Sequence, residues 1–124
     1  MAIGKIGEKL DLNIRQGATF GPVIATMRLV DGTPYDLTGA TIRGQLRKSR
    51  TAAEKIDLDC IITAPLLGEY TFGLTDEVTA TMTAGDSPGD DESKYLWDLE
   101  LSHPDGTVTA LYYGTVKVLR RITQ

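Results

Sequence analysis

The chain has 124 residues, of which 41% are hydrophobic and 24% charged, and its formal net charge is -4 at pH 7. This length fits one domain with its own core, and the composition excludes wholesale disorder. The acidic balance disfavours a nucleic-acid-binding surface, because phosphate contacts need clustered positive charge. The sequence contains neither an apolar run approaching the roughly 18 residues of a membrane-spanning helix nor the N-terminal apolar run of a signal peptide.

Alternating apolar and polar residues predict short β-strands through most of the chain. Residues 1–8 are expected to form an N-terminal tail or arm, and residues 9–124 a single β-sandwich domain. In the first part of this domain, segments with strand character lie at 10–14, 23–29, 42–46, 56–62 and 70–74. Asp31-Gly32 predicts a tight turn, since this residue pair favours the backbone angles that such turns require.

One short helix is predicted near residues 76–84. Thr75 can cap its N-terminus, and the two acidic residues that follow suit the positive end of a helix dipole. Val78 and Met82 lie four residues apart, on one side of such a helix, and Gly85 can end it. The composition of residues 85–93 then predicts a loop.

A hairpin is predicted near the C-terminus. In the segment 95–101, four apolar side chains share one face, whereas Asp98 and Glu100 lie on the other. Pro104 and Gly106 are typical of the turn that follows. On the second strand, 107–119, the residues expected to share a side are Val108, Ala110, Tyr112, Val116 and Val118. About seven short strands with frequent turns predict an antiparallel sandwich or a small barrel.

The residues that support catalysis in other proteins are sparse. Ser102, His103 and Asp105 lie within four residues, but adjacent side chains of an extended segment point to opposite faces. An exposed histidine in a hairpin turn is therefore the preferred interpretation. Cys60 lies on the apolar face of its strand, and a lone cysteine excludes an internal disulfide. We expect no enzyme activity, catalytic residue or cofactor.

A metal site is likewise not predicted. The segment 85–93 contains four acidic residues that could offer oxygen ligands to calcium. The alternating ligand pattern of calcium-binding loops is absent from it, so a solvated acidic loop is the preferred interpretation, with cation binding left open.

Positive charge gathers in and after the segment 42–46. Two of the basic residues lie on the outward face of that strand, where they could meet an acidic partner, although an ordinary solvated face explains them as well. The candidate interface residues are Arg43, Arg47, Lys48, Arg50, Asp90, Asp91 and Tyr113.

Several segments, taken in order, resemble those of a known group of proteins. The sequence RQGATF at 15–20 resembles the R-x-G-D-T-F opening of many small phage tail proteins, with Ala18 where aspartate is usual. DGTPYDLTGATI at 31–42 resembles their D-G-T-P-x-D-L-T-G-A-T-V stretch. YLWDLEL at 95–101, followed by PDGTVT and GTV, resembles their closing hairpin and last strand.

From about Arg15 to its C-terminus, the chain is thus similar to the immunoglobulin-like β-sandwich family of tailed bacteriophages. This resemblance implies an immunoglobulin-like sandwich that serves as a non-enzymatic virion protein of the tail, the baseplate or a fibre attachment. It also implies docking to other phage structural proteins, several copies in the particle or a homo-oligomer, and no nucleic-acid or membrane partner. Synthesis in the cytoplasm of the bacterial host is expected.

Two alternatives remain. A capsid decoration or head-fibre protein could use the same fold, since a fold does not fix its function. A carbohydrate-binding module that contacts the host surface is an alternative of another class. Such modules present exposed aromatic side chains, and Tyr113 is the outward candidate, because Trp97 shares the predicted core face.

Overall fold

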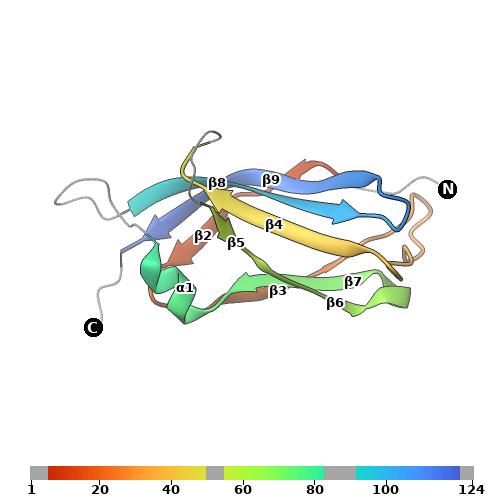
Figure 1. Cartoon of the computed structure of the whole chain (residues 1–124), viewed down its shortest axis with the longest axis horizontal. Coiled ribbons are helices and arrows are strands. Elements are labelled where there is room, and N and C mark those ends of the chain that lie inside the picture. The colour runs from red at the N-terminus through yellow and green to blue at the C-terminus, as the bar shows by residue number, and fades with distance from the viewer. Residues whose placement is uncertain (1–5, 50–54, 83–91, 121–124) are drawn as a thin grey trace.

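The computed structural model describes residues 6–49, 55–82 and 92–120. Within them, two β-sheets pack face to face, with one short α-helix, which confirms the predicted all-β sandwich (Figure 1). The strands are β1 (Glu8–Lys9), β2 (Leu12–Arg15), β3 (Phe20–Thr26), β4 (Thr41–Arg47), β5 (Ile56–Asp57), β6 (Asp59–Ala64), β7 (Glu69–Leu74), β8 (Glu92–Ser102) and β9 (Val108–Leu119). The helical segments are the 3-10 turn η1 (Pro65–Leu67) and the helix α1 (Asp76–Thr81).

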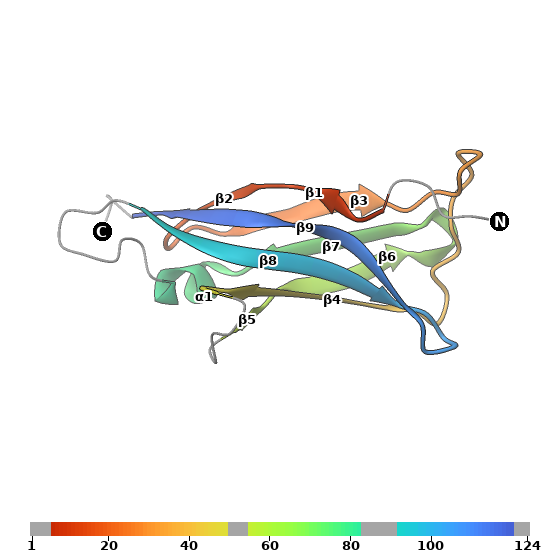
Figure 2. The same cartoon turned by 90° about the horizontal axis from the view of Figure 1, so that it is seen from above.

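One sheet has six strands and the other has three. The six-stranded sheet has the order β1-β9-β8-β4-β5, with β2 also paired to β9, and the three-stranded sheet has the order β3-β7-β6. The expected antiparallel pairing holds except that β1 and β2 run parallel to β9 (Figure 2). A parallel neighbour needs a long connection, and here nearly the whole domain lies between β2 and β9 in sequence.

One of the predicted strands begins later than expected, and another is divided in two. In the segment 10–14, the strand β2 begins only at Leu12, and the Leu10 carbonyl oxygen, in the gap between β1 and β2, accepts a hydrogen bond of 2.7 Å from Trp97 Nε1. In the segment 56–62, the chain leaves the six-stranded sheet after β5 and enters the three-stranded sheet with β6. Leu58, at this crossing, is buried between them.

Part of the expected N-terminal arm belongs to the sheet. Residues 1–5 lie outside the described residues, but the Gly7 amide donates to the Ala110 carbonyl at 2.9 Å. Glu8 then pairs with Tyr112 in β1. Residues 7 and 8 therefore belong to the sheet and not to an arm.

The predicted hairpin is formed by β8 and β9, but its second strand contains a bulge. The pairing register shifts by one residue between Leu99 and Glu100, which leaves Leu111 as an extra residue on β9. Leu111 is 3% exposed, whereas Val108 is 56% exposed and Ala110 is also exposed. The prediction that Val108 and Ala110 share the buried side was wrong, because the bulge reverses the alternation.

The core is organised around Trp97, as its position in the alternation predicted. Its indole stacks between Phe72 of the opposite sheet and Tyr112 of β9, with ring centroids 5.7 and 6.3 Å apart. Val116 and Val118 are fully buried on the same inner face. The aromatic stack joins the two sheets near the middle of the sandwich.

The short helix forms where it was predicted. Thr75 Oγ1 accepts a hydrogen bond of 3.3 Å from the Val78 amide, and Met82 is buried at the other end. Thr79 is fully buried and its hydroxyl is hydrogen-bonded to backbone carbonyls, so a residue with low helix propensity is held by tertiary contacts. The helix ends at Thr81 among the described residues, and the expected stop at Gly85 lies outside them.

Candidate functional site

The outer face of the six-stranded sheet carries a row of polar and aromatic side chains across four strands. Backbone pairing places Gln45 of β4 between Asp57 of β5 and Asp98 of β8. Asp98 in turn lies opposite Tyr113 of β9. Residues directly opposite one another share a face, with Cβ atoms about 4.5–5.5 Å apart. We call these four residues, Asp57, Gln45, Asp98 and Tyr113, the Tyr113 row.

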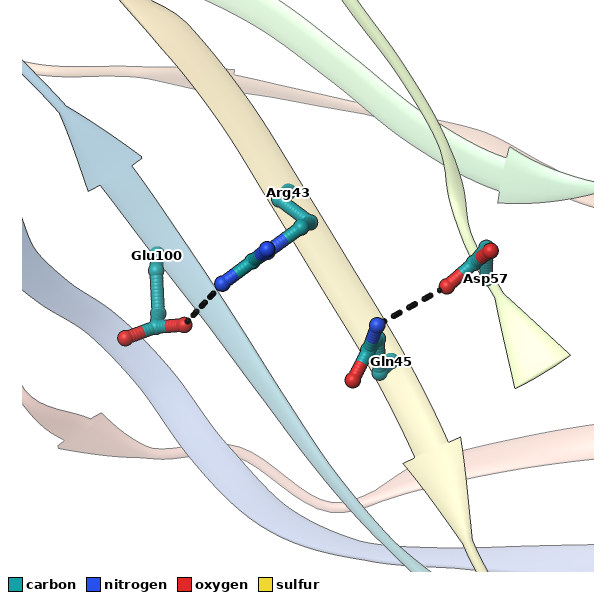
Figure 3. Close-up of polar contacts among 4 residues, drawn as sticks. All are labelled: Arg43, Gln45, Asp57 and Glu100. Carbon is teal, nitrogen blue, oxygen red and sulfur yellow. Dashed lines mark hydrogen bonds and ion pairs between the residues drawn. The ribbon is translucent and has the colours of Figure 1, made fainter. Parts of the chain in front are cut away.

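Hydrogen bonding and an ion pair order the side chains of this face (Figure 3). Gln45 Nε2 donates to Asp57 Oδ1 at 3.0 Å. Two residues along the same strands, Arg43 Nη2 lies 3.5 Å from Glu100 Oε1, with the two side chains 73% and 34% exposed. An exposed pair of this kind contributes little to stability, but it neutralises one of the two arginines on the outward face of β4.

A shallow hollow of about 530 Å³ lies over three members of the Tyr113 row, Gln45, Asp98 and Tyr113. Its floor is the middle of β4, β8 and β9, and Arg47 and Leu96 lie opposite one another within it. The side chains that line it include those of Gln45, Arg47, Leu96, Asp98, Glu100 and Tyr113. Tyr113 is 52% exposed, so an aromatic ring faces solvent beside polar groups.

Asp98 has the most unusual electrostatic setting of this face. Asp98 as a whole is exposed, but its carboxylate is partly buried in the hollow and so loses part of its hydration. This burial, together with the negative charge of Glu100, raises the pKa of Asp98 above its usual value, against the opposing effect of Arg43 and Arg47. Among the described residues, no hydrogen bond reaches the Asp98 side chain. A ligand that donates a hydrogen bond would therefore find an acceptor at this position.

The structure brings only some of the candidate interface residues together. Arg43, Arg47 and Tyr113 share the outer face of the six-stranded sheet. Lys48 does not join them. It comes directly after β4, in register with the inward-facing residues of that strand, and its Nζ lies 5.2 Å from the ring centroid of Tyr95, a core residue. The remaining candidates, Arg50, Asp90 and Asp91, lie outside the described residues.

The outer face of the six-stranded sheet carries charges of both signs, whereas the arginines of β4 alone predicted a basic surface. Asp98 and Glu100 are interleaved with Arg43 and Arg47 by the pairing of β4 with β8. The sequence shows these carboxylates on the polar side of their strand, but it does not reveal that β8 lies beside β4. Sequence reasoning therefore missed Gln45, Asp98 and Glu100 as parts of the candidate site.

His103 is held at the loop end of the sandwich and is not an exposed turn residue. Its Nδ1 lies 2.9 Å from Tyr35 Oη, and its Nε2 lies 2.7 Å from Thr109 Oγ1. The Asp105 carboxylate, instead of orienting the histidine, accepts hydrogen bonds from Thr107. These contacts give the imidazole a structural role, which joins the β3–β4 connection to the β8–β9 turn.

Cys60 lies half-buried on β6. Burial of the thiol is the main reason that the pKa of Cys60 is raised to about 11, with smaller contributions from the charges of Asp59 and Asp57. The thiolate is the reactive form of cysteine, so this environment suits a packing residue and not a nucleophile.

A second exposed surface lies on the opposite side of the sandwich. On the outer face of the three-stranded sheet, Ile24 and Ile61 are both exposed and both pair with Thr71 between them. Two more exposed apolar side chains, Leu66 and Leu67, lie in the adjoining turn η1. These four residues are the exposed large apolar side chains of this sheet and its adjoining turn among the described residues.

Neither a metal site nor a membrane-spanning helix is found in the part of the chain that the structure describes. In ranges 6–49, 55–82 and 92–120, no group of three or more histidine, cysteine, aspartate or glutamate side chains is placed to hold a metal ion. Within the same ranges, no helix has the length and apolar character needed to cross a membrane. Most of the acidic loop at 85–93 lies outside them.

Comparison with known proteins gives little similarity. No family model matches the chain, and no curated protein matches it at a significant level. Among solved structures, the internalin-like protein lmo2027 of Listeria monocytogenes is 12% identical, with a TM-score of 0.31. That match covers 93% of this chain but 28% of the other, so this chain spans less than a third of the length of that protein. A likeness this weak carries no argument about function.

Proposed function

We propose that the chain is a non-enzymatic structural protein of a bacteriophage virion, a component of the tail, the baseplate or a fibre attachment. It acts by docking other virion proteins through the outer face of its six-stranded sheet. The phage assignment is supported by the ordered resemblance of residues 15–20, 31–42 and 95–116 to small tail proteins. The docking role is supported by the surface itself.

The observation that carries the docking role is the exposed Tyr113 among charged side chains of both signs on an open sheet face. Tyrosine and arginine are, with tryptophan, enriched at the energetic centres of protein interfaces. Arg43 and Arg47 flank the hollow from β4 and can form bidentate contacts with carboxylates of a partner. A protein present in many copies does not need a tight single contact, because multivalency raises the overall affinity.

The two exposed faces also suit a protein packed between neighbours. Ile24 and Ile61 lie on one side of the sandwich, and the Tyr113 row lies on the other. Strand edges that are left unpaired, such as those of β3 and β6, favour aggregation unless another element covers them. Incorporation into a particle would cover both the faces and the edges.

The test is to purify particles of the phage or prophage whose genome encodes the chain. Mass spectrometry should detect the protein in these particles, and electron microscopy with an antibody against it should label the tail tip or the base of the fibres. Label over the head would replace the proposal with the capsid-decoration alternative. Absence of the protein from intact particles by mass spectrometry would contradict both.

A further inference from the structure

We propose that the hollow over the Tyr113 row is a binding site for an uncharged oligosaccharide, with the Tyr113 ring as its stacking platform. This inference goes beyond the docking role and concerns the face as it is exposed in the isolated chain, where a virion protein docked over the hollow would compete with the glycan.

Tyr113 provides the apolar part of the site. Its ring is 52% exposed at one end of the row and lines the hollow, whereas Trp97, Phe72 and Tyr112 are stacked inside the sandwich. A large aromatic ring with a polar hydroxyl suits ligands that have both apolar and polar faces. A sugar ring is such a ligand, since one face presents C–H groups and the rim presents hydroxyls.

The neighbours of Tyr113 supply both donors and acceptors. Asp98, directly opposite it, offers carboxylate oxygens that no hydrogen bond within the described residues engages. The guanidinium of Arg47, which also takes part in another interaction, and the amide of Gln45, whose nitrogen donates to Asp57, line the same hollow. A hydroxyl both donates and accepts, so it can bridge an acceptor and a donor that lie side by side. This mixed set fits a polyhydroxylated ligand better than one with a single type of polar group.

The charge balance disfavours highly charged ligands. Two positive charges, from Arg43 and Arg47, lie beside two carboxylates, from Asp98 and Glu100. Arg43 and Glu100 already form an ion pair. A polyanion would meet both carboxylates, and a cation would meet both arginines. The partial burial that raises the pKa of Asp98 also favours a neutral hydrogen-bond donor, which costs less to desolvate than an ion.

Size and shape point to a stretch of a glycan chain and not to a small enclosed molecule. The volume of about 530 Å³ lies within the range of small-ligand sites. The hollow is lined by β4, β8 and β9, which at a spacing of about 4.8 Å span roughly 10 Å. Because the hollow is not enclosed, a longer chain can extend beyond it over the sheet.

The first experiment screens the purified, isotopically labelled chain against an array of neutral bacterial and plant glycans. The best-binding soluble oligosaccharide is then titrated while amide resonances are followed by NMR. We expect the resonances of β4, β8 and β9 around the Tyr113 row to shift, with saturation at millimolar or lower concentration. No binding to any neutral glycan, or shifts confined to other surfaces, would overturn the proposal.

Matched variants test the role of each group. Tyr113→Ala should weaken binding at least tenfold, Tyr113→Phe should retain most of the affinity, and Val108→Ala, an exposed change on the same strand, should leave it unchanged. Asp98→Asn should weaken binding severalfold while the protein stays folded. Equal affinity of the Tyr113→Ala variant and the unchanged chain would also refute the site, whatever the outcome of the particle experiment.

Discussion

Gly114 shows how one small residue fixes the edge of the sheet. A Cβ built at this position would overlap the Leu10 carbonyl oxygen and lie 3.0 Å from Asp11 Oδ1. The same carbonyl accepts the hydrogen bond of Trp97, and Asp11 accepts hydrogen bonds from Thr115. The first strands therefore approach β9 closely because residue 114 has no side chain.

We expect Gly114→Ala to destabilise the protein by about 1–3 kcal/mol, because the new methyl group must displace backbone and not a flexible side chain. Urea denaturation measures the change. Tyr113→Ala, one residue away and on the exposed face, is the control and should have little effect. Equal stability of Gly114→Ala and the unchanged protein would contradict the close packing of this edge.

A second prediction at the residue scale concerns the charge of Asp98. Its pKa is raised on folding, mainly by burial, so the ionised carboxylate opposes folding. Asp98→Asn should therefore be slightly more stable than the unchanged protein at neutral pH. The difference should shrink as the pH falls through the folded pKa and disappear where the unfolded carboxyl is also protonated. Thermal melting across this pH range checks the sign, and a less stable variant at neutral pH would contradict it.

At the scale of elements, the bulge in β9 decides which of its side chains are buried. Leu111→Ala should cost about 2–5 kcal/mol, because it removes a buried leucine from the core, whereas Val108→Ala should be close to neutral. Simple alternation along the strand predicts the reverse order for these two positions. Denaturation of both variants in parallel distinguishes the bulged strand from a regular one.

The outward face of β4 gives a prediction about assembly. Arg43→Glu combined with Arg47→Glu should reduce incorporation into particles severalfold while leaving the isolated chain folded, since both side chains are on the outer face. The double variant Arg15→Glu and Arg28→Glu makes the same change in net charge at exposed positions away from the hollow. Unchanged incorporation of the first variant, measured by quantitative mass spectrometry, would remove this face from the docking proposal.

At the scale of the whole molecule, four aspartate carboxylates stabilise turns and one sheet edge by accepting hydrogen bonds from threonines. Asp31, Asp36 and Asp105 each accept hydrogen bonds from the amide and hydroxyl of a threonine two residues later. Asp11 does the same with Thr115 across the sheet edge. The hydrogen bonds of the threonines lower the pKa of all four groups below the usual 3.8.

These lowered pKa values predict a loss of stability in acid. A carboxyl with a lower pKa in the folded state stabilises that state above its unfolded pKa, and this contribution disappears as the pH falls through the folded pKa. The urea midpoint should therefore fall as the pH drops from the unfolded pKa of about 3.9 through the lower folded pKa values, whereas the contribution of Asp98 has the opposite sign. Replacing Asp31 by Asn should make the fall shallower, and a midpoint that does not change with pH would contradict the role of these groups.

Much of the fold was predictable because its signals are local. Period-two alternation placed Trp97 in the core and identified the hairpin, and Thr75 marked the start of the helix by a cap that spans three residues. The candidate site was predictable only in part. Tyr113 and the two arginines of β4 were recognised as outward residues, but nothing near them in the sequence indicated which strands would lie beside them.

The sequence by itself thus determined the strands, the turns and which side of most strands is buried, since these depend on residues a few positions apart. Tertiary structure alone decided that β1 and β2 run parallel to β9, that Leu111 bulges, and that Asp98 lies between Gln45 and Tyr113. Each of these features depends on the register between strands distant in the chain. That register is fixed by the packing of the two sheets around their common core, and no single segment contains it.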